Sequence, residues 1–182
     1  MRPKSGMRGA LSFGPERPGE AAAIGELLRA VFGGPDEAKL VDGLRDGGHA
    51  IASLVARIGD EAAGYQVVGH LMMSAMSVTV DGRAVPAAAL APLAVAEGFR
   101  GVGIGGRLVE MGLEAARQHG VHAALVLGDA AYYRPFGFDA ATIAHLRTPF
   151  AAGALMALEL VTGALAGRGG SVGYPPPFGL AR

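Results

Sequence analysis

The sequence predicts a single α/β domain in which helices flank a mixed central β-sheet, with the element order β-αα-βββ-α-β-α-ββ. Three observations support this prediction. The chain has 182 residues and is 51% hydrophobic, which suits one packed core. Segments with apolar residues at helical spacing alternate with runs rich in apolar and β-branched residues, and glycine, proline or aspartate separates them. We therefore expect one domain over residues 10–182 and leave residues 1–9 unassigned.

The first part of the chain is expected to form a strand, two helices and three further strands. A short strand near Ala10–Phe13 precedes a helix over Ala21–Phe32, which Gly33-Gly34-Pro35 ends. Asp36 is the expected N-cap of a second helix that continues through Leu44. The three extended segments, separated by turns at Gly59-Asp60-Glu61 and Asp81-Gly82, are Ala50–Arg57, Tyr65–Val80 and Pro86–Val95.

The second part begins with the clearest helix, Ile104–His119, which Gly120 ends. Its expected apolar face consists of Ile104, Leu108, Met111, Ala115 and His119. The elements expected after it are a buried strand over Val121–Leu127, a short helix or turn over Asp129–Arg134, and strands over Phe138–Leu146 and Leu155–Val161.

The composition excludes several classes of protein. The absence of cysteine rules out disulfides, thiolate metal sites and a cysteine acyl-enzyme. The 16 basic residues balance 16 acidic ones, whereas dedicated nucleic-acid binders carry a basic excess, so no nucleic-acid partner is expected. No histidine and carboxylate have metal-site spacing, and no metal is expected. The sequence has no apolar run typical of a signal peptide or a membrane span, so we expect a cytoplasmic protein with no membrane partner. The expected oligomeric state is a monomer or a homodimer.

The most informative segment is Leu93–Leu108, where a strand leads into closely spaced glycines and then into the strong helix. Backbone amides at the start of a helix have no partner within the helix, and the helix dipole favours negative charge there. Glycines leave these amides unobstructed. The segment therefore predicts a site that binds phosphate groups.

Two phosphate ligands fit this pattern. Gly101, Gly103 and Gly106 match the G-x-G-x-x-G of dinucleotide-binding proteins, and Asp129 follows the next strand as the acidic residue of that fingerprint. Against this reading, the charged connection 97–100 separates the strand from the glycines. The chain after Asp129 is also too short to complete a dinucleotide-binding domain.

The second ligand is acyl-CoA. Arg100-x-x-Gly103-x-Gly105 resembles the acyl-CoA-binding motif of the GNAT N-acetyltransferase superfamily, and Tyr133-x-x-x-Gly137-Phe138 resembles the motif that follows the next strand and short helix in that superfamily. Both motifs occur in the right order. Further segments resemble its YhbS-like branch of predicted N-acetyltransferases, namely 53–56, 68–71, 127–129, 156–160 and 174–176.

The resemblance implies a GNAT fold that binds acetyl-CoA as co-substrate. Its pyrophosphate is expected on the backbone of six residues, Gly101, Val102, Gly103, Ile104, Gly105 and Gly106. Its pantetheine is expected along Leu93, Ala94 and Val95, where a backbone N–H near Val95 polarises the thioester carbonyl. Arg100 adds positive charge near the phosphates or is a solvated loop cation.

Tyr133 is the expected general acid that protonates the departing thiolate, with its neighbour Tyr132 as the rival. The general base is not evident, because the strand before Val95 carries no carboxylate. Glu97, His70 and Asp129 are the candidates, although a solvent-facing loop, a structural histidine and a helix cap are their simpler roles.

The resemblance therefore implies an acyl-CoA-dependent N-acetyltransferase that acts by direct attack of an amine in a ternary complex. The alternatives are a non-catalytic acyl-CoA-binding or regulatory domain, motivated by the missing base, and an NAD(P)-dependent oxidoreductase. The amine acceptor is not specified; its pocket is expected between the first two helices and the last two strands.

Overall fold

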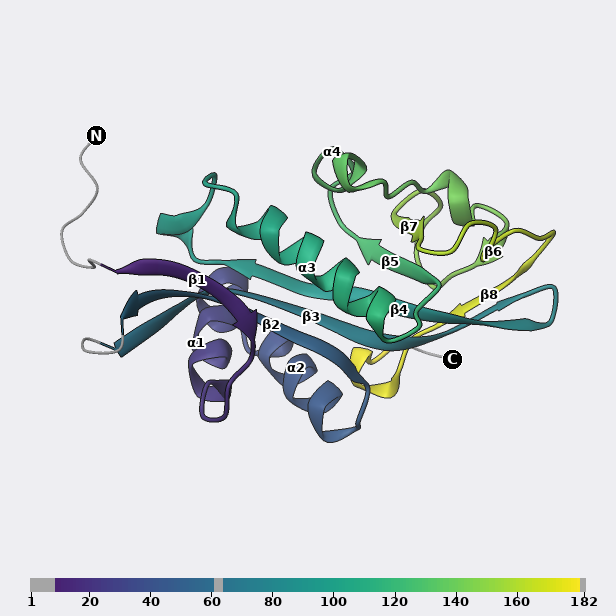
Figure 1. Ribbon diagram of the computed structural model, residues 1–182. Helices are drawn as coiled ribbons and strands as arrows, with labels where there is room; N and C mark the ends of the chain where they lie inside the picture. Colours follow the sequence, from purple (N-terminus) through teal and green to yellow (C-terminus); the bar gives the residue numbers. More distant parts are fainter. Residues whose placement is uncertain (1–8, 61–63, 181–182) are drawn as a thin grey trace.

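The computed structural model describes residues 9–60 and 64–180 and contains an eight-stranded mixed sheet flanked by helices (Figure 1). Six strands follow the order β1-β2-β3-β4-β5-β7, while β8 pairs with β3 and β6 pairs with β8. The strands are β1 (Ala10–Pro15), β2 (Ala50–Asp60), β3 (Gly64–Val80), β4 (Arg83–Val95), β5 (Ala123–Leu127), β6 (Leu146–Arg147), β7 (Leu155–Glu159) and β8 (Gly170–Gly173). Residues 1–8 of the unassigned segment and Glu61 of the expected turn lie outside the described residues.

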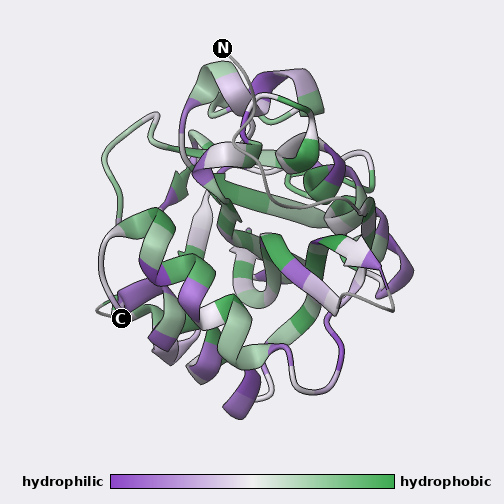
Figure 2. Cartoon of the chain, turned by 90° about the vertical axis from the view of Figure 1, so that its left-hand side faces the viewer, coloured by the Kyte–Doolittle hydropathy of each residue, from purple (hydrophilic) through white to green (hydrophobic). Residues whose placement is uncertain are grey.

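Helices cover both faces of this sheet (Figure 1). α1 (Ala21–Phe32) and α2 (Asp36–Asp46) lie on one face, where an apolar cluster includes Ile24, Leu44, Val55 and Met72. α3 (Ile104–Gln118) lies on the other face, above a cluster that includes Leu71, Met73 and Leu108. The short α4 (Ala130–Tyr133) follows β5. Hydrophobic residues concentrate on the strands and the inward helix surfaces (Figure 2), and no described helix is long and apolar enough to cross a membrane.

The predicted fold class and the elements up to α4 are confirmed, but the last part of the chain differs. The expected strand Phe138–Leu146 is wrong: Asp139 forms a single bridge with Ala157, and a 3₁₀ turn follows at Ala141–Ile143. The Asp139 side chain accepts a hydrogen bond from the Ala141 amide at 2.9 Å, and this local turn competes with a strand. The strand β8, rich in glycine, was not predicted.

Two helix details also differ from the prediction. Pro35 occupies the N-cap position of α2, and Asp36 is its first residue. The buried face of α3 is rotated from the expected one, since Met111 and Ala115 are only partly buried and His119 is exposed. The residues that α3 buries are Ile104, Leu108, Val109, Gly112, Leu113 and Ala116.

The feature of the fold that positions the functional site is a fork between β4 and β5. These strands run parallel but pair only over Ala87–Ala89 and Ala123–Leu125. β4 continues past this point to Val95 while still paired with β3, which places Val95 opposite Gly69. The last residues of β4 therefore have a neighbouring strand on one side only.

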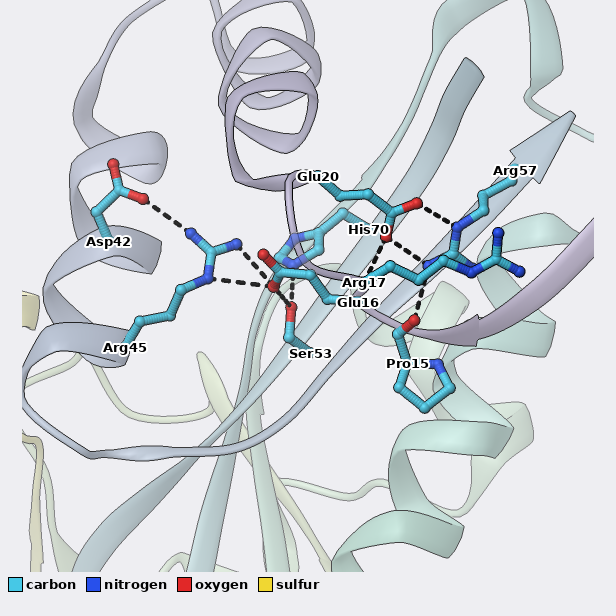
Figure 3. A network of polar contacts seen from close by, with 9 residues as sticks. All are labelled: Pro15, Glu16, Arg17, Glu20, Asp42, Arg45, Ser53, Arg57 and His70. Atoms are coloured by element: carbon cyan, nitrogen blue, oxygen red, sulfur yellow. Dashed lines mark hydrogen bonds and ion pairs between the residues drawn. The ribbon is translucent and has the colours of Figure 1, made fainter. Parts of the chain in front are cut away.

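A buried ion pair fixes α1 to the edge of the sheet (Figure 3). The Arg57 side chain is 1% exposed, and its guanidinium donates to both carboxylate oxygens of Glu20. It also donates to the Pro15 carbonyl at 2.7 Å, so it joins the end of β1, the start of α1 and β2. The hydrogen bond from Arg57 is the main reason why the pKa of Glu20 is lowered.

A second polar chain runs from the surface to a buried histidine (Figure 3). Arg45 donates to one carboxylate oxygen of Glu16 at 2.9 Å, and the Ser53 hydroxyl donates to the same oxygen at 2.5 Å. Since that hydroxyl has only one proton, its oxygen must accept the hydrogen bond from His70 Nε2 at 2.9 Å. His70 is therefore protonated on Nε2, and its Nδ1 is buried without a partner in the described part of the chain.

Replacing Glu20 with alanine is expected to lower the free energy of unfolding by about 3 kcal/mol, because it leaves the buried Arg57 guanidinium without its counter-charge. The control is Glu26→Ala, an exposed position on α1, where we expect a change within about 0.5 kcal/mol. Urea unfolding followed by circular dichroism measures both. Equal losses in the two variants would show that the ion pair contributes nothing specific.

The stability contributed by neutral His70 should be lost on acidification. Burial, and to a lesser degree the charge of Arg45, lowers its pKa from 6.5 to about 3. Below pH 6.5 the unfolded chain therefore binds a proton that the folded chain excludes, and stability falls by up to about 1.4 kcal/mol per pH unit. Unfolding free energies of the wild type and His70→Gln at pH 7 and pH 4.5 test this; the advantage of the wild type should shrink by about 2 kcal/mol. A constant difference would contradict it.

Candidate active site

A cavity of about 600 Å³ lies at the end of β4, beside the fork. Its walls come from the last turn of α1, the end of β4, the connection to α3, the first turn of α3 and α4. The lining residues are Val31, Phe32, Leu93, Val95, Phe99, Arg100, Gly101, Gly103, Ile104, Gly105, Gly106 and Tyr132.

The glycines shape the wall that faces the first turn of α3. Gly101 and Gly103 have φ angles of +78° and +89°, in the left-handed region that side chains disfavour. A Cβ at either position would meet open space, so only hydrogen atoms stand in front of the backbone there. α3 begins at Ile104, and its first intrahelical bond runs from the Arg107 amide to the Gly103 carbonyl at 3.0 Å. The amides before Arg107 have no partner within the helix, which is the arrangement that the predicted anion site requires.

Gly105 has a further role in packing, which the sequence did not predict. A Cβ on Gly105 would collide with the Tyr132 hydroxyl, and one on Gly106 would lie 3.5 Å from the Phe136 ring. The absence of a side chain on Gly105 therefore lets Tyr132 of α4 lie directly against α3, whereas a Cβ on Gly106 would make only an ordinary contact. The two motifs of the sequence therefore form one site.

Arg100 is held at the end of β4. Its Nε donates to the Val95 carbonyl at 3.0 Å, and the side chain lines the cavity. This bond joins the two ends of the connection that contains the 3₁₀ turn Glu97–Phe99. The guanidinium therefore offers its remaining N–H groups next to the glycines.

The hydrogen bonds between β3 and β4 show which amides face the fork. The Ala96 amide donates to the Val68 carbonyl of β3 at 2.9 Å. Because successive residues of a strand direct their amides to opposite sides, the amides of Val95 and Leu93 point away from β3. On that side β5 has already separated from β4. A carbonyl oxygen placed in the fork can accept a hydrogen bond from these amides.

Two of the predicted acetyl-CoA contacts lie outside the cavity lining. Ala94 is 1% exposed, and its side chain packs in the cluster beneath α1 and α2, because side chains alternate between the faces of a sheet. Val102 is 71% exposed and does not line the cavity. Their backbones remain within the predicted segments, but their side chains contribute nothing to the cavity wall.

The two adjacent tyrosines face different surroundings. Tyr132 lines the cavity and is 40% exposed. Tyr133, the predicted general acid, does not line the cavity: it is 8% exposed and packs edge-on against Phe138 with 5.8 Å between ring centroids. Its ring also lies against Gly128, directly after β5, on the side where β5 leaves β4. Burial raises the pKa of Tyr133 to about 12, with a smaller contribution from Tyr132, so both hydroxyls stay protonated at neutral pH.

None of the three predicted bases lines the cavity. Glu97 is exposed at the start of the 3₁₀ turn. The Asp129 carboxylate accepts from the Ala131 amide at 2.9 Å and caps α4. His70 is buried and hydrogen-bonded to Ser53. Within residues 9–60 and 64–180, no three histidine, cysteine or carboxylate side chains are grouped as metal ligands.

Three aromatic and aliphatic residues of the cavity were not predicted as site residues: Val31, Phe32 and Phe99. The sequence marks Val31 only as part of the apolar stripe of its helix. Phe32 follows it as the last residue of α1 and is 43% exposed. The sequence feature that could have marked Phe32 as a site residue is its place at the end of a helix, directly before Gly33 and Gly34.

Comparisons with known proteins support this picture. Residues 16–141 match the model of the acetyltransferase (GNAT) domain family. The chain is 39% identical over 165 residues to the uncharacterised N-acetyltransferase YhbS of Escherichia coli K12, covering 90% of this chain and 95% of that protein. It is 35% identical over 122 residues to the uncharacterised N-acetyltransferase YjhQ of the same organism, covering 66% of this chain and 65% of YjhQ.

Two solved structures show the same fold. The crystal structure of Escherichia coli YhbS in complex with CoA matches with a TM-score of 0.79 and 35% identity, covering 98% of this chain and 96% of that one. A GNAT acetyltransferase from Brucella melitensis in complex with acetyl-CoA matches with a TM-score of 0.73 and 30% identity, covering 94% and 99%. The family and fold implied by the two sequence motifs are thus confirmed, and the chain belongs to the GNAT acetyltransferase family.

Proposed function

We propose that this protein is an N-acetyltransferase that transfers the acetyl group of acetyl-CoA to an amine by direct attack in a ternary complex. The observation that carries the proposal is that one cavity joins the open first turn of α3 to the free amides at the fork. The CoA and acetyl-CoA bound to the two structural relatives support this choice of acyl donor. Membership of the GNAT family accounts for the spacing of Gly101, Gly103 and Gly106 without a dinucleotide ligand.

The described residues fit acetyl-CoA in two places. The amides between Gly101 and Gly106 and the Arg100 guanidinium would hold the pyrophosphate. The backbone of Leu93 and Val95 would bind the pantetheine and thioester with the amides that face the fork.

The transfer itself follows from these groups. The amine nitrogen attacks the thioester carbonyl carbon and forms the C–N bond, while the Val95 amide stabilises the oxyanion of the tetrahedral intermediate. The C–S bond then breaks and its electron pair leaves with sulfur. Burial keeps the phenol of Tyr133 protonated at neutral pH, and this phenol donates its proton to the thiolate. The proton released by the amine passes to water, since none of the three predicted bases lines the cavity.

A second candidate function is an acyl-CoA-binding domain without catalysis, favoured by that missing base. The cytoplasmic location, the monomeric or homodimeric state and the absence of nucleic-acid and membrane partners stay predictions from the sequence.

Replacing Tyr133 with phenylalanine should lower kcat for acetyl transfer by about 10²-fold or more, because the thiolate then leaves unprotonated. The matched variant Tyr132→Phe removes the hydroxyl that lines the cavity and should lower kcat less than tenfold. CoA release with a panel of amines gives kcat, and calorimetry gives the Kd for acetyl-CoA, which should change less than about threefold in either variant. The opposite order of effects on kcat would assign the acid to Tyr132. No CoA release from any amine, despite tight acetyl-CoA binding, would favour the non-catalytic domain.

Replacing Gly103 with glutamate should raise the Kd for acetyl-CoA by about 100-fold or more, since it places a carboxylate at the amides expected to bind the pyrophosphate and forces a side chain into the left-handed region. Gly98→Glu is the control, because Gly98 is exposed in the 3₁₀ turn with open space around it. Calorimetry checks both variants, and circular dichroism checks that each is folded. Unchanged affinity in folded Gly103→Glu would refute this placement of the phosphates.

A further inference from the structure

The cavity at the fork has two chemically different walls. The wall formed by the first turn of α3 and Arg100 is polar and positively charged. The wall formed by Val31 and Phe32 at the end of α1 is apolar, and Phe99, on the connection before Arg100, adds another ring to the lining. α1 and α3 lie on opposite faces of the sheet (Figure 1), so a cavity lined by both reaches past the end of β4 from one face to the other. The polar wall suits acetyl-CoA, which leaves the apolar wall for the acceptor.

Phe32 differs from the other phenylalanines of this chain, all of which belong to an apolar cluster. It is 43% exposed and does not belong to the three apolar clusters formed by the described residues. The adjacent Val31, in contrast, packs partly against the cluster beneath α1 and α2. The Phe32 ring therefore has surface available for an apolar group in the cavity.

Charge narrows the class of acceptor further. Apart from the phenol of Tyr132, the only ionisable side chain among the described lining residues is Arg100, and no lining residue is a carboxylate. An acceptor with several positive charges, such as a polyamine, would therefore find no carboxylate among these side chains to pair with its additional ammonium groups. The last turn of α1, which ends at Phe32, presents helix C-terminal carbonyls that suit one ammonium group.

We infer that the acceptor is a monoamine whose amino group is joined to an apolar body, aromatic or branched aliphatic, that lies against Phe32, Val31 and Phe99. This inference rests on the proposed acetyl transfer and specifies its substrate class. The amine reacts with the thioester as described above, and the apolar body determines which amines reach the fork.

Three probe amines test the inference. In assays of CoA release, kcat/KM for 2-phenylethylamine should exceed that for ethanolamine by at least about tenfold, because only the former buries an aromatic ring. Spermidine should be the poorest acceptor. Fastest transfer to spermidine, or equal transfer to phenylethylamine and ethanolamine, would overturn the inference.

Substitution of Phe32 in the apolar wall provides a second test of the inference. Phe32→Ser should lower kcat/KM for phenylethylamine at least about tenfold and lower that for ethanolamine much less. Leu11→Ser is the matched control: Leu11 is also 43% exposed, and its strand β1 contributes no residue to the cavity. It should leave both values unchanged. An equal loss for both amines in Phe32→Ser, or weaker acetyl-CoA binding in that variant, would assign the wall to the cofactor instead.

A binding measurement keeps the test independent of turnover. With CoA bound, phenylethylamine should bind the wild type in calorimetric titrations and bind Phe32→Ser at least about tenfold more weakly. Absence of phenylethylamine binding to the CoA complex would overturn the inference about the acceptor. Failure of acetyl-CoA itself to bind would instead overturn the proposed function.

Discussion

The functional site of this protein depends on the separation of two strands. β4 and β5 pair over only three residues of each strand, yet β4 continues to Val95. Backbone amides in a sheet normally find partners on both sides, and leaving them without a partner is costly. At the end of β4 the amides of Leu93 and Val95 face the side that β5 has left. A ligand that supplies hydrogen-bond acceptors along this edge takes the place of the missing strand, which suits the amide groups and the thioester of acetyl-CoA.

The glycines around the fork have two separate physical tasks. Gly101 and Gly103 adopt left-handed backbone conformations that bring the chain from β4 to α3 and leave the first helical turn open. Gly105 instead makes room for the Tyr132 hydroxyl. The close approach of α4 to α3 therefore depends on the same short segment that forms the anion site. A substitution at Gly105 would displace Tyr132 and would also change the segment that is expected to bind the phosphates.

The fold and the position of the site could be predicted from the sequence because both are encoded locally. The spacing of Arg100, Gly103 and Gly105 and the segment from Tyr133 to Phe138 lie within continuous stretches whose neighbours are predictable helices and strands. The short strands β6 and β8 could not be predicted, since two residues of β6 and the glycine-rich β8 acquire their extended form only by pairing, β8 with β3 and β6 with β8. The place of Phe32 in the cavity lining could not be predicted either, because it depends on where α1 ends relative to β4.

The account can be tested most directly by following the backbone amide resonances during a titration with acetyl-CoA in nitrogen-15 correlation spectra. If the fork and the first turn of α3 bind the cofactor, the largest shifts should occur at Leu93, Val95 and the amides from Gly101 to Gly106, while β1 and β8 stay unchanged. Saturable shifts concentrated elsewhere, with the amides of Leu93 and Val95 unaffected, would contradict the claim that the separated end of β4 holds the thioester.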